Sequence, residues 1–259
     1  MSAKRKGRGS RPRRETVLVY GRHAVAAALS NPRRRLKRLL ATGDALRALQ
    51  AQAALPDGLA VERMDARSLA AAAPPEAPTQ GLLLETAPLP PLSIDEAGLA
   101  APGPAVVLLL DQVEDPRNVG AILRTAAAFG ARAVITQDRH SPPESGALAK
   151  AASGALDCIA WVRATNLSAA LDHLAKLGYW RIGLAGEASA ALGEVDLGNR
   201  LALVLGSEGR GLRPRVQAHC DLLARIPLQP ASPVIESLNV SAAAAVALYA
   251  VMEPPPRRR

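Results

Sequence analysis

Residues 105–130 limit most strongly what this chain can fold into, because a fully apolar run leads through a charged turn into an amphipathic segment. The run Ala105–Leu110 is typical of a buried strand, and Pro116 interrupts the turn behind it. Apolar residues then recur at helical spacing from Val119 to Ala126. The stretch therefore predicts a strand, a loop and a helix, which together form one unit of an open α/β sheet.

Two polar side chains of this unit, those of Asn118 and Arg124, are predicted to converge where the buried strand ends. Arg124 lies about one and a half turns into the helix and roughly opposite its apolar stripe, so its guanidinium is expected to face the loop that carries Asn118. Open α/β sheets bind ligands at such strand ends. For Asn118 a helix N-cap is the alternative, since a carboxamide can satisfy a free amide there.

The alternation of strands and helices continues to residue 252. Strands are expected at Ala105–Leu110, Ala133–Thr136, Cys158–Val162, Arg181–Ala185, Leu201–Leu205 and Leu223–Ile226, with helices between most of them. This pattern predicts a mostly parallel sheet covered on both faces. Residues 105–252 are expected to form the larger of two domains.

A smaller α/β domain is predicted at residues 16–88. Its expected strands are Val17–Val19, Leu36–Ala41, Leu59–Arg63 and Gly81–Glu85, and its expected helices are His23–Leu29, Ala45–Leu55 and a segment through Leu69. The proline-rich residues 89–104 predict a linker between the two domains.

The net charge of +9 is concentrated at the two ends of the chain. Residues 1–14 hold seven Lys and Arg and no acid, and residues 257–259 are three Arg, which leaves a net charge of about −1 between them. The tails 1–15 and 253–259 are therefore predicted to be disordered. They suit a polyanion such as RNA, and the alternative is a solubilising role without a partner.

Composition excludes several other classes. No apolar run approaches the roughly 20 residues of a membrane span, and the charged N-terminus lacks the apolar core of a secretory signal. Cys158 and Cys220 are too few and too far apart for a disulfide framework or a zinc site, so a reduced cytoplasmic protein without metal is expected. With 2% aromatic residues, a stacking platform for single-stranded RNA is disfavoured.

Two later loops also bear on function. Residues 206–211 place three glycines after a predicted strand, which lets a backbone approach a ligand closely but equally suits a tight turn. Ser237, Asn239 and Ser241 follow another strand end and precede an alanine-rich helix. Capping explains one or two of these three residues, and three exceed what a cap needs.

Together the three segments resemble the SpoU (TrmH-like) family of RNA ribose 2′-O-methyltransferases of the SPOUT superfamily. The matching residues are 115–126, beginning Asp-Pro-Arg-Asn-Val-Gly; 205–212, Leu-Gly-Ser-Glu-Gly-Arg-Gly-Leu; Ile226-Pro227; and 237–241, Ser-Leu-Asn-Val-Ser. The front domain, with Tyr20-Gly21-Arg22-His23 and Gln80-Gly81, is similar to the family's small RNA-binding domain. The subgroup that methylates a 23S ribosomal RNA guanosine is the most similar.

The resemblance implies an α/β fold whose C-terminal domain forms a trefoil knot, a homodimer, and S-adenosylmethionine as the cofactor. The cofactor-binding residues that it implies are Gly186, Leu205, Gly206, Gly209, Ile226, Leu228 and Leu238. Arg22 and Arg38 are the residues expected to bind RNA. The turn from Gln229 to Glu236 is longer than in better-known members of the family.

The implied catalytic residues are Arg124, Asn118, Glu208, Ser237 and Asn239. A free guanidinium is a poor base, so we expect Arg124 to grip the RNA phosphate and stabilise the developing alkoxide. Asn118 and Asn239 would orient the ribose, Glu208 would hold Arg124 or a backbone amide, and Ser237 would bond near the reacting hydroxyl. Transfer RNA as substrate, a non-catalytic RNA-binding protein and a nicotinamide-dependent enzyme are the alternatives.

Overall fold

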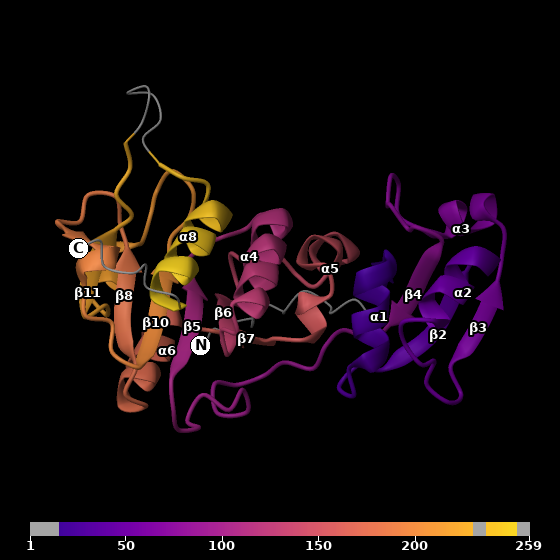
Figure 1. The fold of residues 1–259 in the computed structure, drawn as a ribbon, viewed down its shortest axis with the longest axis horizontal. Coiled ribbons are helices and arrows are strands. Elements are labelled where there is room, and N and C mark those ends of the chain that lie inside the picture. Colours follow the sequence, from indigo (N-terminus) through magenta and orange to yellow (C-terminus); the bar gives the residue numbers. More distant parts are fainter. Residues whose placement is uncertain (1–15, 230–236, 253–259) are drawn as a thin grey trace, which may run out of the picture.

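The computed structural model describes residues 16–229 and 237–252, which form two lobes, each built around one sheet (Figure 1). The predicted tails, 1–15 and 253–259, lie outside the described residues. So does most of the predicted long turn, residues 230–236.

The small lobe has a four-stranded sheet in the order β1-β4-β2-β3. Its elements are β1 (Val17–Tyr20), α1 (Arg22–Ser30), β2 (Leu36–Ala41), α2 (Gly43–Gln50), β3 (Ala60–Arg63), α3 (Ala66–Ala72) and β4 (Leu82–Thr86). Alternate residues point to opposite faces: Leu39 packs with α1 and α2, whereas Leu40 packs with Leu69 of α3. Every predicted strand and helix of this lobe is present. The helix expected at Ala45–Leu55 ends at Gln50, with Ala51 as its C-cap; Pro56 disfavours the helical conformation of Leu55, so the end of the expected range could not be helical.

The large lobe has seven parallel strands in the order β7-β6-β5-β10-β8-β11-β9, which confirms the predicted parallel sheet. Its strands are β5 (Ala105–Leu110), β6 (Ala133–Gln137), β7 (Ala160–Ala164), β8 (Trp180–Leu184), β9 (Ala190–Ala191), β10 (Arg200–Leu205) and β11 (Leu222–Arg225). Its helices are α4 (Pro116–Ala128), α5 (Gly146–Ala152), α6 (Leu167–Lys176), α7 (Pro214–Gln217) and α8 (Val240–Met252), with 3-10 turns η1 (Ala155–Asp157) and η2 (Leu192–Glu194). The strand expected from Cys158 begins at Ala160, because η1 occupies the preceding residues.

Helices cover both faces of this sheet, as the fully apolar strands require. On β5, Leu108 and Leu110 pack with α4, α5 and α8, and Val107 and Leu109 pack with α6 and α7. All four of these side chains are buried. The apolar run therefore forms an interior strand, between β6 and β10, on which the site is built.

The predicted linker, residues 89–104, lies packed along the large lobe. Leu99 is fully buried in its core, and the Leu99 carbonyl accepts a hydrogen bond from the Tyr179 hydroxyl at 3.1 Å. Arg132 donates to the carbonyls of residues 101, 102 and 104. These contacts satisfy polar backbone that proline-rich sequence leaves unpaired.

Strand β11 lies between β8 and β9, although β8 and β9 follow one another in the sequence. Residues 185–189, which join those two strands, cross the end of β11 and bond to it: the Ala185 amide donates to the Ala224 carbonyl at 3.0 Å, and Arg225 donates to the Ala188 carbonyl at 2.7 Å. A knot of the predicted kind requires a crossing like this one. The trefoil knot itself stays a prediction.

Candidate functional site

Four neighbouring strands, β5, β10, β8 and β11, end at one edge of the large sheet. All four are parallel, so the loops that follow them meet there. These loops contain residues 111–115, 206–212, 185–187 and 226–229, and α8 begins beside them. The edge brings together the three motifs, although Asn118 of the first lies 90 positions before Glu208 of the second, and Glu208 lies 31 positions before Asn239 of the third.

The glycine loop after β10 closes on itself. The Ser207 amide donates to the Gly211 carbonyl at 3.2 Å, and the Gly211 amide returns a bond to the Ser207 carbonyl at 3.0 Å. A Cβ at Gly206 would lie 2.1 Å from the Gly211 carbonyl carbon, so no other residue fits there without moving the loop. Gly209 and Gly211 have φ of 78° and 62°, a region that favours glycine. The turn alone therefore accounts for all three glycines.

A cavity of about 750 Å³ opens between the loops after β8, β10 and β11 and the start of α8. All seven residues predicted to bind the cofactor line this cavity: Gly186, Leu205, Gly206, Gly209, Ile226, Leu228 and Leu238. Glu187, Ser207, Arg210 and Gln217 also line it, and sequence reasoning did not select them. Glu187, Ser207 and Arg210 each adjoin a selected glycine, whereas Gln217, at the end of α7, had no such signal. The volume falls within the range of sites for ligands of cofactor size.

A second, smaller hollow of about 340 Å³ lies against the loop after β5. Asn118 and Asp115 line it, together with Gln112, Val113 and Glu114. Ser207, Glu208 and Arg210 line both cavities, so the glycine loop separates them.

Asn118, Glu208 and Asn239 form one hydrogen-bonded cluster where the two cavities meet. The Asn118 Nδ2 donates to Glu208 Oε1 at 2.7 Å, and the Asn239 Nδ2 donates to the same oxygen at 2.7 Å. Asn239 Nδ2 also lies 3.1 Å from Asn118 Oδ1. The structure thus joins three residues predicted for the site, one from each of the three motifs. Hereafter we call them the Asn–Glu–Asn cluster.

Helix capping does not explain Asn118. The N-cap of α4 is Asp115, whose carboxylate accepts from the Arg117 amide at 2.7 Å, and Asn118 lies within the first turn. The N-cap interpretation of Asn118 is therefore wrong. Asn239 does act as a cap, because its Oδ1 accepts from the Ser241 amide at 2.9 Å while its nitrogen joins the cluster.

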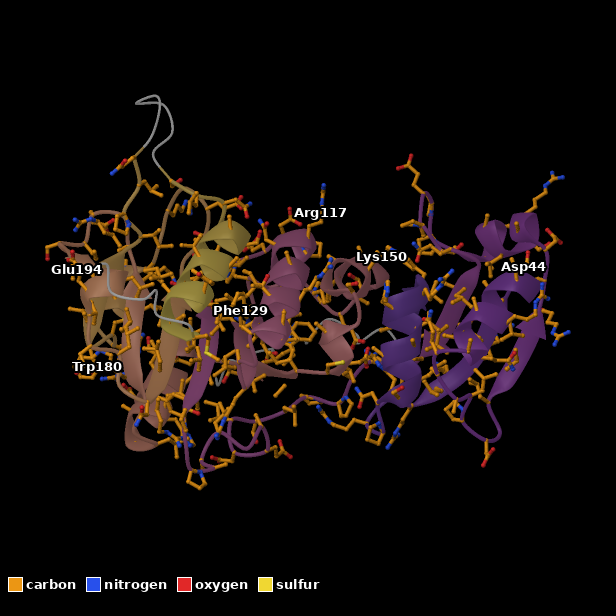
Figure 2. All side chains as sticks on the ribbon, viewed as in Figure 1. Asp44, Arg117, Phe129, Lys150, Trp180 and Glu194 are labelled. Carbon is orange, nitrogen blue, oxygen red and sulfur yellow. The ribbon has the colours of Figure 1, made fainter. Side chains whose placement is uncertain are left out.

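Arg124 lies away from this cluster, contrary to the expected convergence. It is exposed, lines neither cavity, and has no hydrogen bond or ion pair with any residue in the described ranges 16–229 and 237–252. It follows Asn118 by six positions, which places the two side chains about 120° apart around a helix. It shares a face of α4 with Arg117, whose side chain points into solvent (Figure 2).

The expected partners of Glu208 were also wrong. Its carboxylate accepts from two side-chain carboxamides, in place of Arg124 or a backbone amide. Ser237 is exposed and lines the larger cavity. Its hydroxyl has no hydrogen bond to a described residue.

Buried Asp111 fixes the end of β5 beneath the site, a role that sequence reasoning missed. Its carboxylate accepts from the Arg213 amide at 3.0 Å and from Arg213 Nε at 2.8 Å. The side chain of Asp111 is fully buried, and a charge in that setting has to be paired. Its position as a lone acid directly after an apolar strand is the sequence signal that could have identified it.

The two arginines predicted to bind RNA lie in the small lobe, away from the cluster. Arg38 on β2 forms ion pairs with Glu85 at 2.8 Å and Glu62 at 3.2 Å, on a half-exposed surface. Arg22 begins α1, and its amide donates to Gln80 Oε1 at 3.0 Å. Arg38 therefore has competing partners, whereas the exposed Arg22 guanidinium has none among the described residues.

The described residues contain neither a metal-binding group nor a membrane-spanning helix. No group of three or more His, Cys, Asp or Glu there could hold a metal ion. No helix in the same part of the chain has the length and apolar character of a membrane span.

Comparison with known proteins gives two family matches. Residues 105–249 match the SpoU rRNA Methylase family, and residues 18–92 match a model described as RNA 2′-O ribose methyltransferase substrate binding. The chain is 37% identical over 242 residues to 23S rRNA (guanosine-2′-O-)-methyltransferase RlmB of Pseudomonas putida, covering 89% of this chain and 94% of that protein.

The protein of the same name from Coxiella burnetii is 47% identical over 148 residues, which is 57% of this chain and 58% of that protein. This second match thus spans less than two thirds of the relative. The SpoU methyltransferase AviRb of Streptomyces viridochromogenes, crystallised with the cofactor AdoMet, has a TM-score of 0.76. It is 20% identical and the match covers 92% of this chain and 90% of that one, which shows a shared fold. From the family match over more than half of its length, this chain belongs to the SpoU rRNA methylase family.

Proposed function

We propose that this protein transfers a methyl group from S-adenosylmethionine to a ribose 2′-hydroxyl of RNA, and that its substrate is a guanosine of 23S ribosomal RNA. The Asn–Glu–Asn cluster carries the proposal, because it places fixed polar groups where a cofactor-sized cavity meets a second hollow. The name of the Pseudomonas putida relative supports the substrate.

The larger cavity fits the proposed cofactor. Ile226, Leu228 and Leu238 give it apolar walls suited to an adenine ring, and the closely turned glycine loop brings backbone groups to its edge. When bound, the sulfonium supplies an already activated methyl group. The chain has to align the hydroxyl behind that methyl and stabilise negative charge on the oxygen.

The cluster is suited to orient the ribose. Glu208 Oε1 holds both carboxamides, while Oε2 has no partner among the described residues and Asn118 keeps a second N–H. These groups are available to a ribose hydroxyl, as is the Ser237 hydroxyl. Arg124 and Arg117, on one exposed face of α4, provide positive charge for the neighbouring phosphate.

The small lobe is proposed to grip the RNA outside the transfer site, because residues 18–92 match the substrate-binding model. Arg22 is the stronger of the two predicted contacts, since Arg38 is already paired. We further propose that residues 16–88 and 105–252 form two domains, that the basic tails 1–15 and 253–259 bind RNA, and that the protein acts in the cytoplasm.

A homodimer is part of the proposal. Ala242, Val246 and Tyr249 form an apolar stripe on the outer face of α8, and Val246 and Tyr249 are 43% and 52% exposed. Large apolar side chains at this spacing mark an interaction surface. Light scattering of the wild type should give twice the mass of one chain. The variant Tyr249→Glu should give the mass of a single chain. A wild-type monomer would contradict this part.

Mapping 2′-O-methyl groups tests the main proposal. RNA from a strain lacking the protein should lose one methylated guanosine in 23S ribosomal RNA, and complementation with the wild type should restore it. Complementation with Asn118→Asp should not. Loss of a site in transfer RNA instead would overturn the substrate, and no loss at all would overturn the activity.

A further inference from the structure

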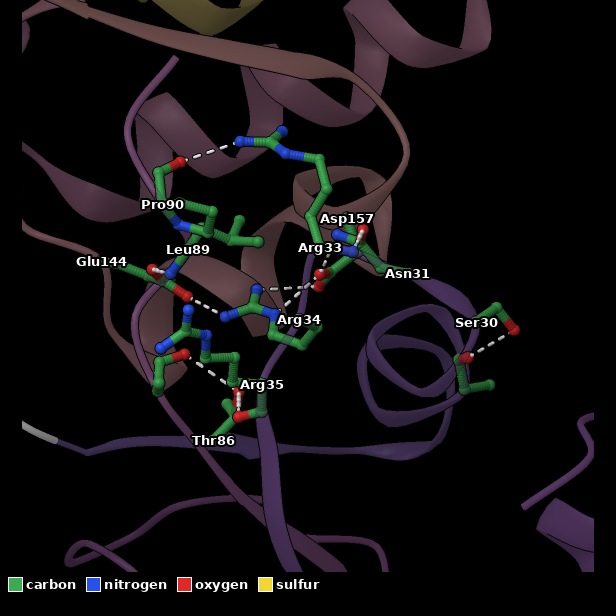
Figure 3. Close-up of polar contacts among 12 residues, drawn as sticks. Ser30, Asn31, Arg33, Arg34, Arg35, Thr86, Leu89, Pro90, Glu144 and Asp157 are labelled. Carbon is green, nitrogen blue, oxygen red and sulfur yellow. Dashed lines mark hydrogen bonds and ion pairs between the residues drawn. The ribbon is translucent and has the colours of Figure 1, made fainter. Parts of the chain in front are cut away.

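A buried ionic network joins the two lobes (Figure 3). Arg34 Nε donates to Asp157 Oδ1 at 2.8 Å, and Arg34 Nη2 donates to Asp157 Oδ2 at 3.0 Å. Arg34 Nη1 also bonds to Glu144. The side chains of Arg34, Asp157 and Glu144 are 0%, 1% and 9% exposed, so the network is closed to water.

Three separate segments meet in this network. Arg34 precedes β2 in the small lobe, whereas Glu144 precedes α5 and Asp157 ends η1 in the large lobe. Asn31 Nδ2 donates to Asp157 at 2.9 Å. The Leu89 amide, at the start of the segment between the lobes, donates to Glu144 Oε2 at 2.7 Å. Both lobes and their connection are therefore bonded to the same two carboxylates.

The contact around the network is closely fitted. A Cβ at Gly146 would lie 2.3 Å from the Leu18 carbonyl oxygen, and one at Gly154 would lie 2.9 Å from the His23 carbonyl oxygen. The backbone of α5 and η1 thus touches β1 and α1 directly. Surfaces packed this closely do not slide, because any shift produces a clash or a void.

A bidentate guanidinium–carboxylate pair adds a defined orientation to this packing. Arg34 can hold both Asp157 oxygens only while its planar fork faces them. Burying three charges costs desolvation energy that apolar residues would avoid, so such a network is a poor means of gaining stability alone. Its distinctive effect is to penalise other orientations of the two lobes, because a small rotation leaves a buried charge unpaired.

We propose that Arg34 is a positioning residue for methyl transfer: it holds the small lobe in one orientation, so that RNA gripped there presents its ribose to the Asn–Glu–Asn cluster. The part concerning RNA rests on the proposed function. Arg34 itself touches neither cavity. Its effect should therefore appear in the use of RNA and leave cofactor binding unchanged.

Arg34→Met tests the proposal, with Arg35→Met as the matched control, because the neighbouring Arg35 side chain is exposed and has no bond to a described residue. Small-angle scattering should show a broader distribution of lobe separations for Arg34→Met. Its kcat/KM for RNA should fall by about 10²-fold, since misplacement by an ångström has effects of this size. The Kd for S-adenosylmethionine measured by calorimetry should stay the same, and Arg35→Met should resemble the wild type.

A triple variant, Arg34→Met with Glu144→Gln and Asp157→Asn, covers the case in which the single variant fails to fold, because it leaves no unpaired buried charge. It should fold and show the same broadened scattering and lowered kcat/KM. Unchanged scattering, or broadened scattering with wild-type kcat/KM, would overturn the positioning role. If the wild type methylates no RNA, the proposed function fails, whereas the scattering comparison still decides whether Arg34 fixes the lobes.

Discussion

The Asn239 carboxamide donates to the Glu208 carboxylate at 2.7 Å. The same carboxamide caps α8, since its oxygen accepts from the Ser241 amide at 2.9 Å. One side chain therefore couples the first turn of a helix to the glycine loop. Any ligand that moves either segment changes the position of the carboxylate between the two cavities.

Asn118→Asp should lower kcat by about 10²-fold and leave the Kd for S-adenosylmethionine nearly unchanged, because the new carboxylate cannot donate to Glu208 and repels it. Stability should survive, since Asp115 and not Asn118 caps α4. Methyl-transfer kinetics and calorimetry measure the two effects. Asn166→Asp is the matched control, because Asn166 only accepts bonds as the cap of α6 and aspartate accepts equally well. Wild-type kcat in Asn118→Asp would remove Asn118 from the mechanism.

Gly206→Ala should weaken cofactor binding by at least about tenfold and cost about 1–3 kcal/mol of folding stability. The added methyl would lie 2.1 Å from the backbone of Gly211, so the loop that lines the larger cavity has to open. Titration calorimetry and thermal unfolding check the two effects. Gly193→Ala provides the comparison, because a Cβ there meets nothing within 4 Å. Equal affinities for the two variants would show that loop closure is not needed.

Asp221→Asn should reduce stability at neutral pH by about 1 kcal/mol, the upper end for a partly exposed pair. The hydrogen bond from the Arg181 side chain lowers the pKa of Asp221. A lowered folded pKa stabilises the protein above the unfolded value of about 3.9, and this contribution disappears as the pH falls through the folded value. The difference in unfolding free energy from the wild type should thus shrink below about pH 4. Asp57→Asn, in an exposed turn, is the control. A difference independent of pH would contradict the assignment.

The two cysteines should differ in reactivity. Burial raises the pKa of the Cys220 thiol to about 11, and its sulfur lies beneath Gly183 and within 3.5 Å of the Val216 carbonyl oxygen. Cys158 is exposed. At pH 8 a thiol reagent should modify Cys158 well before Cys220, because only the thiolate of an accessible sulfur reacts. Mass spectrometry of the labelled peptides measures the order, with denatured protein as the control. Equal rates in the folded protein would contradict the burial of Cys220.

Local patterns predicted most of the fold, because each apolar strand and each amphipathic helix encodes its own period. Short elements were not predicted. Strand β9 has two residues, and its pairing with β11 depends on a chain crossing that no local sequence pattern indicates. Sequence motifs identified the site residues, but the sequence did not predict how their side chains are arranged in space. The helical repeat places Asn118 and Arg124 on different faces, and the partner of Glu208 comes from another motif. The sequence did not indicate that Arg34 is buried, because an arginine within a basic run is expected to be exposed to solvent.

Arg124→Ala should abolish methyl transfer, lowering kcat/KM for RNA by at least about 10²-fold, and leave S-adenosylmethionine binding unchanged. The guanidinium is exposed, lines neither cavity and pairs with no described residue, so its removal disturbs neither the fold nor the cofactor site. An unpaired arginine on the same helix as Asn118 has its charge available for an RNA phosphate, whose contacts weaken as salt rises. Filter binding of RNA across a salt series should therefore show a shallower slope for the variant. Arg215→Ala, another exposed arginine beside α6, is the control. Loss of cofactor affinity in Arg124→Ala would show that this residue acts on the cofactor side. If activity is lost while the salt dependence of RNA binding stays as in the wild type, Arg124 does not contact a phosphate and acts at the ribose instead.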